Sequence, residues 1–99
     1  MPKESTIVKQ IKKYLDTLDH CHFEKTHGGY FGNNGKPDIT GCLRGWRFEI
    51  EAKQPGEVPR PLQKAVMKKW ERAGALVGVA YSVEDVKKML GPAFRKEEK

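Results

Sequence analysis

The chain has 99 residues, which suits one domain and leaves no room for a second. It carries 19 Lys and Arg residues against 13 Asp and Glu, a formal net charge of +6. This excess fits a nucleic-acid partner, although a lysine-rich domain that binds no polyanion has the same charge. No stretch approaches the ~20 apolar residues of a membrane span, and no apolar signal-peptide core follows Met1. Two cysteines are too few for a disulfide framework. We therefore expect a single cytoplasmic domain that does not contact a membrane.

The N-terminal residues recur at the spacing of a helix. Ser5 or Thr6 is predicted to cap a helix that runs to about Leu18. A short strand over 22–26 follows, and then a glycine-rich loop over 28–35. The buried stripe predicted for the helix consists of Ile7, Ile11, Tyr14, Leu15 and Leu18.

The loop contains two adjacent aromatic residues, Tyr30 and Phe31. Aromatic side chains on a loop beside an active site can stack on nucleic-acid bases. Alternatively, one of the two folds back into the core. We keep both as candidate DNA contacts.

A hairpin is predicted in the middle of the chain. Residues 46–53 alternate strictly between apolar and charged, which is typical of a half-buried strand, and residues 38–43 form a candidate partner strand. Arg44-Gly45 is a turn signal between them. With a two-residue or four-residue loop, Asp38 faces Glu51 with the Cβ atoms about 4.5–5.5 Å apart. A three-residue loop would shift the register by one and separate them.

Two facing carboxylates repel each other and destabilise a sheet unless a cation lies between them. Hard divalent cations such as Mg²⁺ accept one or two carboxylates and leave their other positions to water and phosphate oxygens. Lys53 lies one step beyond Glu51 on the same face and could stabilise charge on a phosphate. The pattern thus outlines a site of metal-assisted hydrolysis. The alternative is a solvated strand face with ordinary Glu–Lys pairs.

A second helix is predicted after the proline-rich segment 54–61. Pro61 suits its first turn, and the helix should run over 62–73. Lys64, Lys68 and Arg72 recur along one side, where they are either solvated or follow a phosphate backbone. The predicted apolar face consists of Leu62, Ala65, Val66, Trp70 and Ala73.

The last elements complete an α/β fold. The apolar run 76–81 predicts a strand covered on both faces. A short helix to Leu90 follows, and 91–99 should be a frayed tail. The expected order is α-β-β-β-α-β-α, with one mixed β-sheet flanked by helices.

Three ordered motifs resemble those of the PD-(D/E)xK nucleases, and within them the virus-type replication–repair nuclease (VRR-NUC) domain. The motifs are Gly35-Lys36-Pro37-Asp38, Glu51-Ala52-Lys53 and Pro61-Leu62-Gln63. The resemblance extends from the first helix to about Tyr81. It implies a restriction-endonuclease-like core and cleavage of DNA phosphodiesters with Mg²⁺ or Mn²⁺.

The resemblance also implies roles for individual residues. Asp38 and Glu51 would bind the metal together with the Ala52 backbone carbonyl, and Glu4 on the first helix would complete its shell. Lys53 would orient or deprotonate the attacking water. Further implied site residues are Gln63, as a catalytic group, and Lys36, as a DNA contact. Glu49 is expected to form an ion pair with a nearby Lys or Arg, with occasional help to a second metal.

The function expected on this basis is metal-dependent DNA endonuclease activity in a bacterial or phage-infected cell. The small free-standing members of the family imply selectivity for branched DNA such as Holliday junctions. A symmetric homodimer would supply two sites for two nicks. Two alternatives remain: a non-catalytic nucleic-acid-binding module of the same fold, and an RNA nuclease.

Overall fold

The sheet begins from a tight hairpin. In the computed structural model, which describes residues 2–26 and 35–95, Arg44 and Gly45 have φ values of 53° and 88°. Positive φ at both central residues is the conformation of a two-residue type I′ turn, which matches the twist of the flanking strands. Leu43 consequently pairs with Trp46 and Ile39 with Ile50. The predicted register is confirmed.

Eight elements make up the described chain. They are α1 (Glu4–Leu15), β1 (Cys21–Lys25), β2 (Ile39–Leu43), β3 (Trp46–Ala52), α2 (Pro61–Arg72), β4 (Leu76–Ala80), α3 (Val83–Met89) and α4 (Gly91–Phe94). The strands lie in the order β1-β2-β3-β4. The first three are antiparallel, and β4 runs parallel to β3 after the crossover through α2. The predicted mixed sheet flanked by helices is confirmed.

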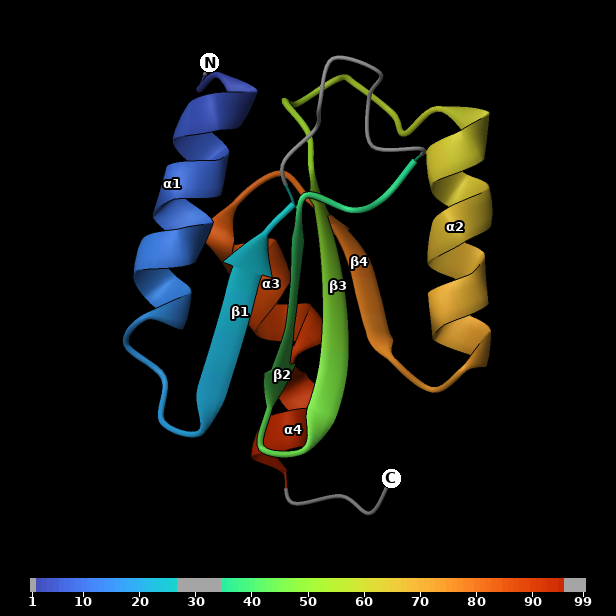
Figure 1. Cartoon of the computed structure of the whole chain (residues 1–99). Coiled ribbons are helices and arrows are strands. Elements are labelled where there is room, and N and C mark those ends of the chain that lie inside the picture. The colour runs from blue at the N-terminus through green and yellow to red at the C-terminus, as the bar shows by residue number, and fades with distance from the viewer. Residues whose placement is uncertain (1, 27–34, 96–99) are drawn as a thin grey trace.

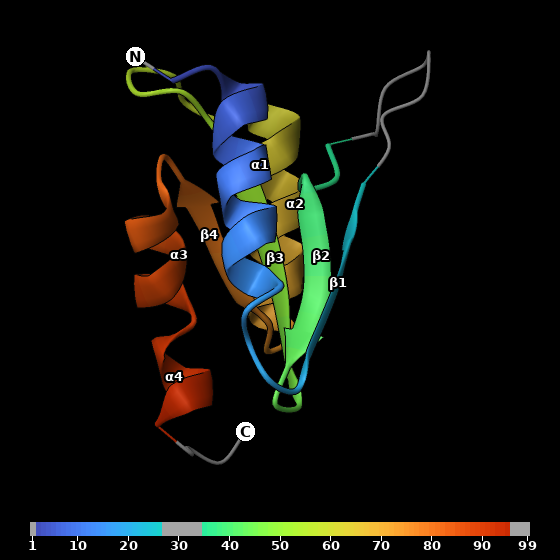
Figure 2. The same cartoon turned by 90° about the vertical axis from the view of Figure 1, so that its left-hand side faces the viewer.

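The helices lie in two layers. In Figure 2, α1 lies in front of the sheet and α2 behind it. Helix α3 contacts both α1 and β4. It lies on the same face of the sheet as α1 and covers β4 there. Helix α2 stands beside β4 on the opposite face (Figure 1). The two faces of β3 are therefore packed against different helices.

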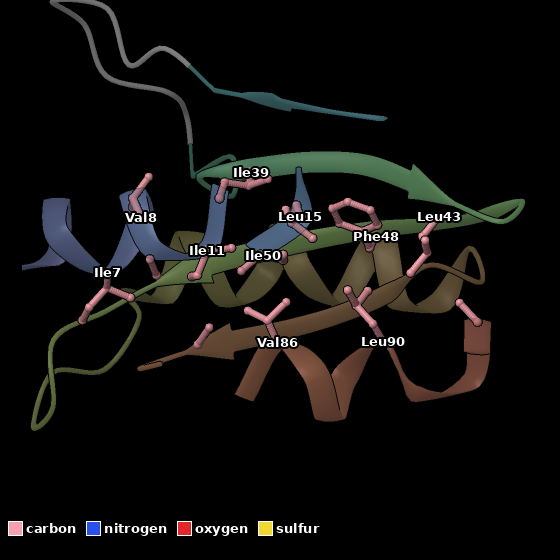
Figure 3. Packing of buried hydrophobic residues seen from close by; sticks show 13 residues of the cluster. Ile7, Val8, Ile11, Leu15, Ile39, Leu43, Phe48, Ile50, Val86 and Leu90 are labelled. Carbon is pink, nitrogen blue, oxygen red and sulfur yellow. The ribbon is translucent and has the colours of Figure 1, made fainter. Parts of the chain in front are cut away.

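The apolar core lies between the sheet and the α1/α3 layer (Figure 3). Phe48 and Ile50 on β3 are fully buried there. Full burial of such a side chain contributes about 1.5–3 kcal/mol relative to leaving it exposed. The partners from the helices are Ile7, Val8, Ile11, Leu15, Val86 and Leu90.

The burial of β3 differs from the prediction of a half-buried strand. Residues 48–52 are all buried, including Glu49 and Glu51 on the face opposite the core. Helix α2 packs over that face, where Gln63 contacts Glu51. The alternating sequence identified the two faces of β3 correctly. It did not predict that both faces are buried.

The helix predictions also need correction. Helix α1 begins at Glu4 after an extended Lys3 and ends at Leu15, so Ser5 and Thr6 lie in its first turn and do not cap it. Helix α2 has nearly the predicted bounds but a different buried side. Leu62 is 57% exposed, and Ala65 and Ala73 are also exposed. The inward side chains include Gln63 and Met67, because α2 covers the polar face of the sheet.

The C-terminal predictions have different outcomes. The prediction that strand β4 is covered on both faces is confirmed, because α2 and α3 pack on opposite faces of it, although residues 76–79 are only partly buried at the edge of the sheet. Residues 91–94 form a helical turn with Ala93 buried, so the predicted frayed tail does not begin at Gly91.

Tyr30 and Phe31, the two aromatic residues predicted to contact DNA, lie outside the described residues. No helix in the described part of the chain is long and apolar enough to cross a membrane.

Candidate metal centre

Three carboxylates from separate segments of the chain converge where β3 ends. Asp38 directly precedes β2, Glu51 is the penultimate residue of β3, and Glu4 is the first residue of α1. One oxygen from each lies within 4.8 Å of the others. The hairpin register brings the first two together, and the packing of α1 on the sheet adds the third.

Backbone groups hold the two strand carboxylates in place. The Asp38 N–H donates to Glu51 Oε1 at 3.2 Å. In return, the Ala52 N–H donates to Asp38 Oδ2 at 2.9 Å. Each carboxylate is therefore fixed by the strand that carries the other, so the pair depends on the register rather than on flexible side chains.

Glu51 is the most buried member of the cluster, with 2% of its surface exposed. Its Oε2 accepts a hydrogen bond from Gln63 Nε2 at 2.7 Å. Burial, followed by the charges of Asp38 and Glu4, raises the pKa of Glu51 to about 7, although Lys53 acts in the opposite direction. A carboxyl group that holds its proton near neutral pH is frequent at functional sites.

The Lys53 ammonium lies near both Glu51 and Glu4. Its Nζ lies 3.5 Å from Glu51 Oε2 and 3.9 Å from Glu4 Oε1, and its side chain is 12% exposed. Desolvation, then the charge of Asp38, raises the pKa of Glu4, and Lys53 lowers it. Lys25 on β1 approaches Asp38 at 3.8 Å. Two ammonium groups thus partly compensate three carboxylates.

Gln63 is oriented by both ends of its amide. Its Oε1 accepts from the Arg60 N–H at 2.8 Å, which caps the start of α2, while its Nε2 donates to Glu51. The cap fixes which amide atom faces the carboxylate. The predicted position of Gln63 in the first turn of the helix is therefore what lets it reach the cluster.

Solved structures with the same arrangement of elements identify the fold. A chain described as "VRR_NUC domain" is 28% identical, covers 92% of this chain and 97% of its own length, and superposes with a TM-score of 0.73. A second, "VRR_NUC domain protein", is 17% identical and covers 98% of this chain and 92% of its own, with a TM-score of 0.74. The chain has the VRR-NUC fold. No family model matches the sequence, and neither does any curated protein.

The VRR-NUC fold is a nuclease-family fold, and the resemblance inferred from the motifs is confirmed. Within it, the donor set of the cluster fits a hard divalent cation. Carboxylate oxygens are the ligands that Mg²⁺ and Mn²⁺ prefer, and three of them converge at Glu4, Asp38 and Glu51. In the described part of the chain, this is the group of acidic, His or Cys side chains with metal-binding geometry.

Glu49 lies outside the cluster, although it shares a strand face with Glu51. Its Oε2 accepts hydrogen bonds from Arg47 Nε at 2.7 Å and from the Thr40 hydroxyl. The predicted ion pair with a nearby arginine is confirmed. The position of Glu49 on β3 does not place it among the converging carboxylates.

The basic residues predicted as DNA contacts do not lie on one surface. Lys64 and Lys68 line a cleft of about 350 Å³ against Val77 and Val79 of β4, and Arg72 is exposed. Lys36 instead lines a cleft on the β2 side of α2. Sequence reasoning missed three cations near the site or this second cleft: Lys25, Arg47 and Lys69. Arg47 could have been found from its place on the same strand face as Glu49 and Glu51.

Proposed function

We propose that this VRR-NUC domain is a divalent-metal-dependent DNA endonuclease. The observation that carries the proposal is the convergence of Glu4, Asp38 and Glu51 within 4.8 Å, with the Lys53 ammonium 3.5 Å from Glu51. A carboxylate cluster beside a lysine is the arrangement needed to hold a cation and a phosphate together. The net charge of +6 supports a polyanionic substrate.

Mg²⁺ or Mn²⁺ bound at the cluster would acidify a water molecule and neutralise charge on the scissile phosphate. Asp38, just before β2, and Glu51 on β3 would hold the cation. The Ala52 N–H points toward Asp38, and a residue in an extended strand turns its N–H and C=O to the same side. The Ala52 carbonyl therefore faces Asp38 as well and is suited to be a backbone ligand.

Lys53 and Gln63 act on the groups around the cation. The Lys53 ammonium carries three donors and can orient or deprotonate the attacking water or pair with a phosphate oxygen. Gln63 holds Glu51 Oε2 and leaves Oε1 on the Asp38 side. Glu4 extends the cluster from α1 and is the most exposed of the three acids, so it can tune the metal shell.

We further propose that the substrate is branched DNA such as a Holliday junction and that the active form is a homodimer. A domain of this length buries only about 60–70% of its unfolded surface, so dimerisation would add stability. A twofold dimer would present two metal centres for two symmetric nicks. Equal rates on junctions and linear duplex would refute the selectivity, and a monomer at working concentration would refute the dimer.

Cleavage of labelled substrates tests the activity. Junction, duplex and RNA versions are incubated with the wild type and Asp38→Ala in Mg²⁺, Mn²⁺ or chelator. We expect metal-dependent nicking of DNA that is lost in Asp38→Ala and retained in Glu84→Gln, which removes an exposed carboxylate on α3. Tight binding without cleavage under every metal would instead indicate a non-catalytic binding module. Preferential cleavage of RNA would indicate an RNA nuclease.

A further inference from the structure

A second polar cluster occupies the sheet face that carries the metal centre. Arg47 Nε donates to Glu49 Oε2 at 2.7 Å, and Arg47 Nη2 donates to Thr40 Oγ1 at 2.7 Å. The same guanidinium lies 4.3 Å from the centre of the Trp70 ring. Two hydrogen bonds and a ring contact on three different elements fix the guanidinium plane.

The exposure of the two charged partners is unequal. Glu49 is 2% exposed, whereas the Arg47 side chain is 49% exposed. Burying a carboxylate is costly, and apolar residues commonly replace a buried ion pair without loss of stability. A buried carboxylate that supports a half-exposed guanidinium therefore serves to orient the guanidinium. The hydrogen bonds that Arg47 makes within 2–26 and 35–95 use Nε and Nη2, and the guanidinium carries further donors on Nη1.

The oriented guanidinium lines a cleft of about 470 Å³ between α2 and the polar face of β2 and β3. This volume is within the range of small-ligand sites. Lys36 and Lys69 also line the cleft, so three cations accompany the single carboxylate of Glu49. Trp70 and Val66 contribute apolar wall from α2. The cleft combines a fixed guanidinium with two lysines, which are the groups that bind phosphate.

The cleft adjoins the metal centre. Pro37, which lines it, directly precedes Asp38. Glu49 is one same-face step, about 6.7 Å, from Glu51 along β3. A nucleic-acid strand whose scissile phosphate lay at the carboxylates would thus bring a nearby phosphate of the same strand to Arg47.

We propose that this cleft is a binding site for a backbone phosphate one or two nucleotides from the scissile phosphate. Arg47 is its anion receptor, Glu49 is a positioning residue, and Lys36 and Lys69 add charge. The proposal rests on the proposed function in taking a nucleic acid as the ligand. Because a phosphate carries no base identity, the site strengthens binding equally for all sequences.

Binding without cleavage tests the cleft directly. Fluorescence anisotropy of a labelled duplex and a labelled junction is measured in chelator between 50 and 200 mM salt, for the wild type, Arg47→Ala, Arg47→Lys and Lys69→Gln. Lys88→Gln on α3, on the opposite face of the sheet, is the charge-matched control. Thermal melting of each variant reports any structural loss.

We expect Arg47→Ala to weaken binding about tenfold, the size of a charge-assisted hydrogen bond. Its log–log salt slope should fall by about 0.9, the contribution of one neutralised phosphate on duplex DNA. Arg47→Lys should keep the slope and lose part of the affinity, because lysine lacks the planar fork. Lys69→Gln should lower the slope more than Lys88→Gln.

The proposal is overturned if a folded Arg47→Ala binds DNA with wild-type affinity and slope. If Arg47→Ala does not fold, wild-type binding by both Arg47→Lys and Lys69→Gln overturns it equally. The same experiments distinguish a failure of the nuclease proposal from a failure of the phosphate-site proposal. If the wild type cuts nothing but Arg47→Ala still shows the loss of affinity and slope, the phosphate site stands and the catalytic proposal fails.

Discussion

The stability of the metal-free protein should fall as the pH rises through the range in which Glu51 loses its proton. Burial and the neighbouring charge of Asp38 raise the pKa of Glu51 from an ordinary 4.5 to about 7. Between these two values the folded protein holds a proton that the unfolded chain has lost. The free energy of unfolding therefore decreases as the pH rises through this window. The stability that the Glu51 proton contributes is fully present only below pH 4.5.

The size of the effect follows from the two pKa values. Each pH unit between 4.5 and about 7 is worth about 1.4 kcal/mol, so the loss approaches about 3 kcal/mol above pH 7. Glu51 is nearly inaccessible to solvent, so solvent screening does little to reduce this figure. A domain of this size is stable by only about 5–15 kcal/mol, so the loss is a large fraction of the total.

Urea unfolding at pH 4.5 to 8 in chelator, for the wild type and Glu51→Gln, measures the effect. The difference between the two proteins isolates Glu51 from the other groups that titrate. We expect the wild type to lose stability relative to Glu51→Gln as the pH rises, and saturating Mg²⁺ to remove most of that trend. A difference that stays constant from pH 4.5 to 8 would refute the argument that Glu51 is protonated near neutral pH.

Three further predictions concern the groups that build the site. Gln63→Ala should cost about 1–2 kcal/mol in chemical denaturation, because it removes both the helix cap and the amide that donates to Glu51; an unchanged midpoint would contradict this. Arg44→Asn should raise stability by up to about 1 kcal/mol, since asparagine adopts positive φ more readily, and a lower Tm would argue against a strained turn. Gly41→Ala should lose about 1–3 kcal/mol, because an added Cβ would overlap the His22 backbone carbonyl on β1 and the ring of Phe48; wild-type stability would show that both β1 and the ring can move.

The strand pairing of the site could be derived from the sequence because it depends on local rules. The alternation of 46–53 and the dipeptide Arg44-Gly45 determine the register, and the register brings Asp38 to Glu51. Lys53 follows on the same face by the period of a strand. These relations span fewer than twenty residues and need no knowledge of how the helices pack.

The sequence could not predict which side of α2 is buried. Leu62 and Ala65 are apolar but exposed, and the polar Gln63 is turned inward. A helix that covers an apolar sheet face would have the opposite arrangement. Helix α2 covers the face of Glu49 and Glu51 instead, so its inward side combines Gln63, which donates to Glu51, with the apolar Met67. Periodicity of hydrophobic residues carries no information about that choice.

The high pKa of Glu51 also explains how the cluster can be assembled before a cation arrives. Three carboxylates within 4.8 Å would repel one another if all were charged. A proton on Glu51, with Lys53 at 3.5 Å, removes most of that repulsion while the backbone bonds to Asp38 keep the geometry. A cation must then displace the proton, so its affinity should rise about tenfold for each pH unit below 7 and level off above it. Calorimetry of Mg²⁺ binding in buffers of different ionisation enthalpy would detect the released proton, and binding without proton release at pH 6 would show that the carboxylates converge fully charged.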